Sequence, residues 1–404
     1  MGGPTRQRVR ERHVRAVMRA LVSLGVASRS ALATHVGLDR STMTHVTSAL
    51  LEAGLIEPIA QAPSGRQGGR RAELLAVERS RFAVVGADVQ PAGIRWVLCD
   101  LRGNVQRSGS LGPSMPSAAG TVRRAWIQGL LEDLKAEIRT ATANRKVLGV
   151  GLALPGLFDQ SERRLVESVE LGLTNVDLAE LWHSLWHSAW HTDTPSLRPD
   201  NDATCYAWRE IATHRRALSA GDATSADGVY VYTKLHRDGR RFLPAGVRVG
   251  VTVVAAGRIV SGARGAAGRL RGYRWSREDG SQLGIDLERI RVERGEQEAL
   301  TAAATELVRN LVVVASVLDP MRIVIAGDLA AFGRQIQEIV GKLVPRELAP
   351  VEIREPEPLA VAHGAAQMVL EGLFSNGAHR MPLAAVIETG ANGSAATFDT
   401  GYTR

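Results

Sequence analysis

Side chains that could bind a polyanion are concentrated near the start of the chain. One short run offers a guanidinium, three hydroxyls and an imidazole within six residues, and it consists of Arg40, Ser41, Thr42, Thr44 and His45. Arginine can form two hydrogen bonds to guanine or to a phosphate, and hydroxyls can donate to phosphate oxygens. These residue types favour nucleic-acid binding over bond-making chemistry.

Three predicted helices position this polar run. Apolar residues at helical spacing predict a helix over residues 9–24, and Ser28 is a suitable N-cap for a short second helix that ends at Gly37. Asp39 can cap a third helix, whose buried stripe leaves the polar run facing outward. Because a helix-turn-helix places its second helix in the major groove of DNA, we expect the run, together with Arg29, to contact DNA.

A segment rich in Gly and Arg, residues 63–71, lies between two strand-like runs and predicts the tip of a β-hairpin wing. Arginines on such a loop can enter a narrow minor groove, where the negative potential is enhanced. The wing adds Arg66, Arg70 and Arg71 to the expected DNA contacts. The alternative is a solvated helix face in a protein–protein module, which a basic wing disfavours.

The distribution of charge also indicates a polyanionic partner. The chain of 404 residues has 50 basic and 42 acidic side chains, a net charge of +8, and residues 1–78 hold 11 arginines against six acidic residues. Charge concentrated in one fifth of a chain is typical of a nucleic-acid-binding region. No apolar run of about 18 residues and no N-terminal leader pattern occurs, so we expect a cytoplasmic protein that does not cross a membrane.

The composition changes at about residue 81, where strand-like runs begin to alternate with helical stretches, which predicts an α/β fold. We therefore expect a DNA-binding domain over residues 1–78 and an α/β domain over residues 79–375. Residues 376–404 show little periodicity and are rich in Gly, Ala, Asn and Thr, so we expect a disordered tail there.

Several motifs together resemble one known family. Residues 27–44, 50–56 and 69–71 look like the winged helix of the transcriptional repressors of the ROK family (repressor, open reading frame, kinase). The similarity continues downstream in the segments 149–159, 201–203 and 257–268, and it covers about residues 9–374. The resemblance implies an N-terminal winged helix-turn-helix followed by a two-lobed, actin-like (ribonuclease H-like) domain.

Family members with kinase activity bind ATP and sugar between the lobes, but the corresponding loops differ in this chain. The family's Asp-x-Gly-Gly-Thr loop is replaced by residues 88–93, in which Gln90 adds bulk and Pro91 removes an amide donor. Arg248 replaces the middle glycine of the second phosphate loop. Asp202 matches the family's catalytic base, although Asn201 and Asp202 also read as a helix N-cap. We predict no catalytic residue and no cofactor.

The sugar-recognition motif has changed as well. The family's Glu-x-Gly-His corresponds here to residues 269–272, so a guanidinium stands in place of the carboxylate and no side chain replaces the imidazole. Charge alone thus favours a phosphorylated or carboxylated effector, with Asn201, Asp202, Arg269 and Arg271 as ligand-binding residues. The alternative is that these arginines pair with acids such as Glu278 and that no effector exists.

Two patterns could suggest a metal. The zinc motif of many relatives is missing, since residues 273–284 contain neither Cys nor His, and we predict no zinc there. Three Trp and three His alternate over residues 182–191, each set at a spacing of four. A Trp stripe is usually core or an oligomer surface, and the His face lacks an acidic or Cys ligand, so we predict no metal site.

The sequence thus predicts a DNA-binding transcriptional regulator, expected to be a repressor. Two copies would engage an inverted-repeat operator in double-stranded DNA, which implies a homodimer or homotetramer. One alternative is a ROK sugar kinase that uses its winged helix for autoregulation. A further alternative is a regulator that acts without any ligand.

Overall fold

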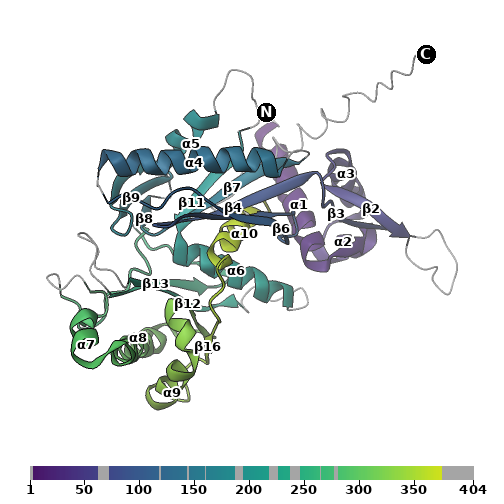
Figure 1. Cartoon of the computed structure of the whole chain (residues 1–404). Helices are drawn as coiled ribbons and strands as arrows, with labels where there is room; N and C mark the ends of the chain where they lie inside the picture. Colours follow the sequence, from purple (N-terminus) through teal and green to yellow (C-terminus); the bar gives the residue numbers. More distant parts are fainter. Residues whose placement is uncertain are drawn as a thin grey trace.

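The fold consists of a small N-terminal unit beside two α/β lobes (Figure 1). The computed structural model describes residues 3–61, 72–117, 120–142, 145–159, 161–186, 194–217, 226–236, 246–263, 265–276 and 281–374. Four sheets are present within these residues: two of five strands and two of three strands. The five-stranded sheets form the cores of the two lobes, as predicted for an actin-like fold.

The N-terminal unit is a winged helix-turn-helix. Its elements are α1 (Gly3–Leu24), β1 (Val26–Ser28), α2 (Arg29–Val36), α3 (Arg40–Glu52), β2 (Ile56–Gln61) and β3 (Glu73–Val77). Both predicted caps are present, because Ser28 Oγ accepts the Ala31 amide at 3.2 Å and Asp39 Oδ1 accepts the Thr42 amide at 2.9 Å. The strands pair in the order β1-β3-β2, which gives the predicted wing hairpin.

The sheet of lobe I has the order β11-β7-β4-β5-β6. Strands β4, β5 and β6 form an antiparallel meander, whereas β7 and β11 are added in parallel. Helices α4 and α5 lie on one face and α10 on the other (Figure 1). The bounds are β4 Phe82–Gln90, β5 Gly93–Cys99, β6 Val105–Leu111, α4 Thr121–Ala141, β7 Lys146–Leu154, α5 Leu178–Trp186, β11 Ser196–Asn201 and α10 Ala360–Phe374. Strands and helices thus alternate after about residue 81, as expected.

The sheet of lobe II has the order β14-β13-β12-β15-β16, which is the strand order of lobe I read from the opposite edge of the sheet. The elements are β12 Gly228–His236, β13 Gly246–Ala255, β14 Arg258–Ile259, α7 Leu287–Arg294, α8 Glu296–Leu318, β15 Ile323–Gly327, the 3-10 helix η2 Asp328–Phe332, α9 Gly333–Leu343 and β16 Val351–Ile353. Among the described helices, α8 alone is long and apolar enough to cross a membrane, and half of that stretch is buried. It packs on the lobe II sheet as a core helix.

Two helices lie between the sheets. Helix α6 (Asp202–Ala217) packs against β12 and β13 of lobe II and against α10, and α10 packs in turn on β4 and β7 of lobe I. The approach is close, since a Cβ added at Gly151 would meet the Ala365 carbonyl oxygen at 2.1 Å. The fourth sheet, which consists of β8 (Leu157–Asp159), β9 (Arg164–Ser168) and β10 (Leu173–Asp177), extends lobe I toward the cleft.

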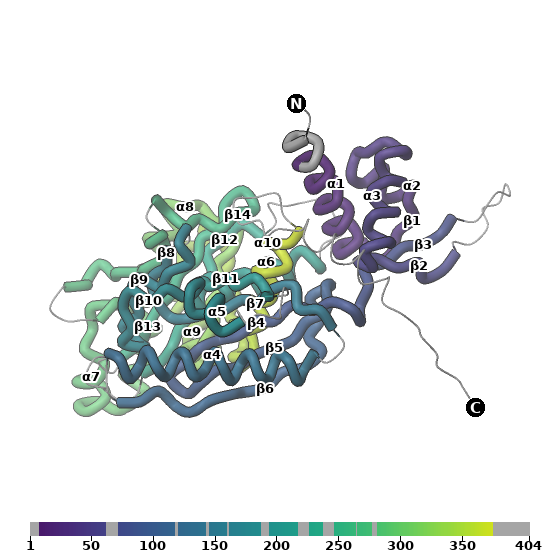
Figure 2. Tube along the Cα trace, turned by 90° about the horizontal axis from the view of Figure 1, so that it is seen from above, coloured from purple at the N-terminus to yellow at the C-terminus, as the bar shows by residue number. Residues whose placement is uncertain are grey.

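The winged helix is packed directly on lobe I, and Figure 2 shows it at one end of the two-lobed body. A single apolar cluster joins Met18 and Leu21 of α1 to Val97 of β5 and Leu373 of α10. The buried Arg15 guanidinium donates to the carbonyl oxygens of Gly372 (3.1 Å) and Leu373 (2.7 Å). Arg15 therefore caps the C-terminal end of α10. The predicted boundary between the DNA-binding domain and the α/β domain, at residue 78, remains a prediction. The predicted disordered tail, residues 376–404, lies outside the described residues.

Candidate functional site

Helix α3 presents the predicted polar face to solvent. Arg40, Ser41, Thr44 and His45 are exposed, whereas Met43, Val46 and Leu50 are buried under the helix. Thr42 is half-buried, and its hydroxyl donates to Asp39 Oδ2 at 2.6 Å, so it extends the N-cap. This hydrogen bond and the Thr42 amide lower the pKa of Asp39. The N-terminal turn of α3 is therefore held rigidly with its polar groups outward.

Arg29 is engaged within the winged helix. Its Nη1 lies 2.7 Å from Glu73 Oε2 on β3, and its Nε donates to Thr47 Oγ1 on α3 at 3.1 Å. The Thr47 hydroxyl itself donates to the Met43 carbonyl. Arg29 thus ties α2 to α3 and to the wing strand. The predicted wing contacts Arg66, Arg70 and Arg71 lie outside the described residues.

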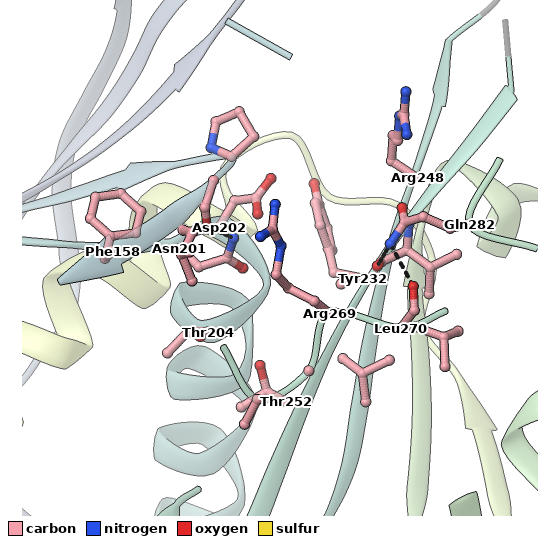
Figure 3. A pocket seen from close by; sticks show the side chains of 18 of the residues that line it. Phe158, Asn201, Asp202, Thr204, Tyr232, Arg248, Thr252, Arg269, Leu270 and Gln282 are labelled. Atoms are coloured by element: carbon pink, nitrogen blue, oxygen red, sulfur yellow. Dashed lines mark hydrogen bonds between the residues drawn. The ribbon is translucent and has the colours of Figure 1, made fainter. Parts of the chain in front are cut away.

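A cavity of about 300 Å³ lies between the two lobes. It is lined by the turn after β7, the start of α6 and the strands β12 and β13 (Figure 3). Residues 259–261, 265, 267–271, 275 and 282 complete the lining. All four predicted ligand-binding residues line it: Asn201, Asp202, Arg269 and Arg271. The tertiary structure therefore brings together side chains that are about 70 residues apart in sequence.

Asp202 has both of its carboxylate oxygens occupied. Oδ1 accepts the amide of Ala203 at 2.9 Å, and Oδ2 lies 2.6 Å from the Nζ of Lys234. Asn201 also accepts the Ala203 amide through its side chain, at 2.9 Å, and donates to the carbonyl oxygen of Gly156. The two residues thus cap α6, in agreement with the N-cap interpretation.

Lys234, on β12, is the centre of a buried charge cluster. Its Nζ also lies 3.4 Å from Glu170 Oε1, and Glu170 Oε2 lies 3.6 Å from His236 Nε2. Burial raises the pKa of Glu170, but Lys234 and His236 outweigh it and lower the pKa to about 2. Burial disfavours the charged form of Lys234, yet Asp202 and Glu170 raise its pKa well above the ordinary value. Sequence analysis missed Lys234 and Glu170.

Ion pairs therefore cross the cleft from one lobe to the other. Glu170 and Glu167 belong to lobe I, whereas Lys234 and His236 belong to lobe II. Arg269, also from lobe II, lies 3.2 Å from Glu167 Oε2. The expected partner Glu278 lies outside the described residues. No pattern in the sequence shows which charged side chains of the two lobes face each other across the cleft.

The hairpin between β4 and β5 contains residues 88–93, the segment that differs from the family's first phosphate loop. Residues 91–92 form the turn between the strands, and Gln90 donates to the carboxylate of Asp88. Asp88 is buried and its Oδ1 has no hydrogen-bond partner within the described residues. Burial raises the pKa of Asp88 to about 6, despite the opposing effect of Lys234. Arg248, which was aligned with the middle glycine of the second phosphate loop, lies on β13.

The Trp stripe packs inward over the part of α5 that the structure describes. Trp182 is buried and its indole N–H donates to the Pro195 carbonyl at 2.8 Å, while Trp186 lies 5.5 Å from it between ring centroids. His183 is exposed, and His187 and His191 lie outside the described residues. Within the described residues, no group of three or more His, Cys, Asp or Glu side chains could hold a metal ion.

Fold and site together define a protein with a winged helix-turn-helix and a ROK-type two-lobed body. Over 94% of its length the structure superposes on a solved ROK-family transcriptional regulator, a homologue of the Escherichia coli MLC protein, with a TM-score of 0.67 and 18% identity, and it covers 100% of that chain. It also matches a ROK-family protein of Streptococcus pneumoniae solved with sucrose, with a TM-score of 0.50 and 16% identity over 70% of this chain and 96% of the other.

Similar sequences carry regulator names. The DNA-binding transcriptional dual regulator NagC of Escherichia coli is 22% identical over 262 residues, which are 65% of this chain and 57% of NagC. The xylose repressor of Caldicellulosiruptor bescii is 21% identical over 166 residues, 41% of this chain and 40% of the repressor. The chain thus spans about half the length of these relatives, and no family model matches it. The resemblance to ROK-family regulators, and the fold that it implied, are confirmed.

Proposed function

We propose that the protein is a DNA-binding transcriptional repressor. The observation that carries this proposal is the capped, solvent-exposed face of α3, which offers Arg40, Ser41, Thr44 and His45 on the second helix of a helix-turn-helix. A rigid N-terminal turn can present such groups to base edges in the major groove. The similarity to NagC and to a xylose repressor supports regulation of transcription.

The residues of the face have different roles in this proposal. Arg40 reads a base or binds a phosphate, and Ser41, Thr44 and His45 add contacts along the groove. Arg29 acts as a positioning residue, because its ion pair with Glu73 sets the angle between the recognition helix and the wing. The predicted minor-groove contacts of Arg66, Arg70 and Arg71 complete the interface. The partner is an inverted repeat bound by a homodimer or homotetramer.

The cleft supports a regulator without kinase activity. A general base must accept a proton from the substrate hydroxyl, and it needs a free carboxylate oxygen within hydrogen-bond reach. Asp202 instead binds the Ala203 amide and the Lys234 ammonium. The alternative, a sugar kinase with autoregulatory DNA binding, requires Lys234 to leave Asp202 during turnover. Coupled ATP turnover with a panel of hexoses, lost in Asp202→Asn, would favour that alternative.

Fluorescence anisotropy on genomic fragments beside the protein's own gene tests the DNA-binding proposal. We expect one fragment to bind more tightly than the others, with affinity falling steeply as salt rises. Arg40→Ala should cost about 1–3 kcal/mol if it contacts a base. Arg289→Ala, an exposed arginine on α7 with the same loss of charge, is the matched control and should have no effect. Equal, weak binding of all fragments, unchanged in Arg40→Ala, would contradict the proposal.

A further inference from the structure

The winged helix is joined to lobe I by a short segment that has little freedom, residues 78–81 between β3 and β4. The buried Glu78 side chain accepts the Ser80 amide at 2.7 Å through Oε1 and the Arg81 amide at 2.8 Å through Oε2. The Glu78 amide itself donates to the Leu55 carbonyl oxygen at 3.0 Å. The segment is therefore a hydrogen-bonded turn, in contrast to the Gly- and Ser-rich stretches that form flexible linkers.

A second attachment joins α1 to the C-terminal end of α10. Arg15 donates to the carbonyl oxygens of Gly372 and Leu373. Arg19, which lies one turn further along α1 and is exposed, donates to the Phe374 carbonyl oxygen at 3.0 Å. The last carbonyls of a helix have no partner within the helix, so the two guanidinium groups stabilise this end of α10. The middle of α1 is thereby fixed to lobe I.

The loop between β5 and β6 of lobe I makes a third attachment. Arg102 in this loop donates from its Nη2 to the carbonyl oxygen of Gly25, the residue that separates α1 from β1. Gly25 has a φ of +74°, and its amide donates to the Leu21 carbonyl oxygen at 2.9 Å, so its position at the end of α1 is fixed. Arg102 therefore binds the joint at which the chain leaves α1 and enters the wing sheet.

The backbone of this loop is itself held by the two helices between the lobes. The buried carboxylate of Asp100 accepts the Arg102 amide at 2.9 Å. The Arg102 carbonyl oxygen accepts Nη2 of Arg216, on α6, at 2.8 Å. The Gly103 carbonyl oxygen accepts Nε2 of Gln367, on α10, at 3.0 Å. The Arg102 guanidinium thus reaches the winged helix from a rigid base.

Attachments at three separate places fix the orientation of a body as well as its position. We propose that lobe I holds the winged helix in a single orientation, and that Arg102 thereby determines which spacing of operator half-sites a homodimer accepts. Arg102 acts without touching DNA, because it holds the joint that sets the direction of α3. Winged helices on flexible linkers would accept several spacings. This inference rests on the proposed function, since it concerns how a DNA-binding dimer selects its operator.

Fluorescence anisotropy with synthetic duplexes tests the spacing. The duplexes carry the half-sites mapped by footprinting on the genomic fragment: both at their natural spacing, both with two base pairs inserted between them, or one alone. Two base pairs turn one half-site by about 70° around the DNA axis and move it by about 7 Å. Because one winged helix then loses its contacts, the unmodified protein should bind the inserted duplex about 100-fold less tightly than the natural one.

Substitutions at two of the attachments should relax this discrimination. In the double variant Arg102→Gln with Arg19→Gln, the penalty for the inserted duplex should fall below about tenfold, because the second winged helix can then reach its half-site. Affinity for a single half-site should be unchanged. Arg102→Lys keeps a charged donor and should retain most of the discrimination. Arg107→Gln is the matched control, since Arg107 is an exposed arginine of the same sheet that donates to a carbonyl oxygen outside the winged helix, that of Ala141.

Distances between spin labels test the orientation without DNA. Cys99 and Cys205, the two cysteines of the chain, are buried, so labels can be placed at exposed positions by Ser48→Cys on α3 and Ser108→Cys on β6. Doubly labelled chains are diluted with unlabelled chains to suppress distances between copies. We expect one narrow distance distribution that broadens in the double variant and stays narrow in Arg107→Gln.

Three results would overturn the inference. They are a broad distance distribution in the unmodified protein, equal affinity of that protein for the natural and inserted duplexes, and a double variant that discriminates between them as strongly as the unmodified protein. Specific binding of a single half-site together with any of these results rejects the inference alone. Lack of specific binding to every duplex rejects the proposed function, and with it the role of Arg102 in spacing, whereas the distance distribution still decides whether lobe I fixes the orientation.

Discussion

The Nζ of Lys234 lies 2.6 Å from Oδ2 of Asp202, and both residues line the cavity between the lobes. The lysine comes from lobe II and the aspartate opens the helix between the lobes. Lys234 also lies 3.4 Å from Glu170 of lobe I. One ammonium therefore neutralises two buried carboxylates and joins the lobes across the cleft.

Removal of this ammonium should destabilise the protein. In Lys234→Met, Asp202 would lose its ammonium partner and Glu170 would keep only His236, and breaking a buried pair in this way costs about 3–5 kcal/mol. Denaturant unfolding of the two proteins measures the difference. Lys342→Met, which removes an exposed lysine on α9, should change the free energy of unfolding by less than about 0.5 kcal/mol. The double variant Lys234→Met with Asp202→Asn should recover part of the lost stability. If the unmodified protein, Lys234→Met, Lys342→Met and the double variant all had the same free energy of unfolding, a structural role of the pair would be disproved.

Asp88 should make stability depend on pH. Its pKa is about 6 in the folded chain against 3.8 ordinarily, because burial disfavours the charged carboxylate. Between these values the folded state retains a proton that the unfolded state has lost, so stability falls as pH rises from about 4 to 6. The total loss is on the order of 3 kcal/mol. Thermal melts of Asp88→Asn should lack this fall, and a parallel pH profile for the variant would show that another group is responsible.

Arg15 should fasten the winged helix to lobe I. Its guanidinium is 1% exposed and donates to two carbonyl oxygens at the end of α10. Arg15→Met would leave these oxygens without their donor, at a cost of roughly 2 kcal/mol or more. Arg12→Met, on the exposed face of the same helix, is the matched control. Hydrogen exchange should show faster opening of α1 and of the last turn of α10 in Arg15→Met only. Unchanged exchange in both helices would contradict this role.

Gly37 should be required because of its backbone conformation, and not because a side chain at this position would clash with a neighbour. It ends α2 with φ of +72°, and a Cβ there would meet no atom within 4 Å. Gly37→Ala should therefore cost about 1–2 kcal/mol, the usual penalty for a side chain in the left-handed region. Gly37→Asn should cost less, because asparagine tolerates this conformation. Denaturant unfolding of both variants measures the difference, and a larger loss in Asn than in Ala would point to a steric cause instead.

The sequence by itself determined the features that depend on neighbours along the chain. Ser28 and Asp39 cap their helices through amides three residues ahead, so the residue types and their spacing were sufficient to predict both. The strand-like runs expected after about residue 81 include β4 and β13, because the apolar side chains of a buried strand are close together in the sequence. The exposed face of α3 followed from its buried stripe.

Only the tertiary structure decided which charged groups meet. Arg29 was predicted to contact DNA, which stays a prediction; its ion-pair partner Glu73 is 44 residues away and becomes a neighbour only when the wing strand folds back. Lys234 carried no signal in sequence, because its partners Glu170 and Asp202 come from a different lobe and from the intervening helix. Local patterns encode caps and buried faces through short-range geometry, whereas ion pairs across a cleft depend on how two separately formed sheets are packed against α6 and α10.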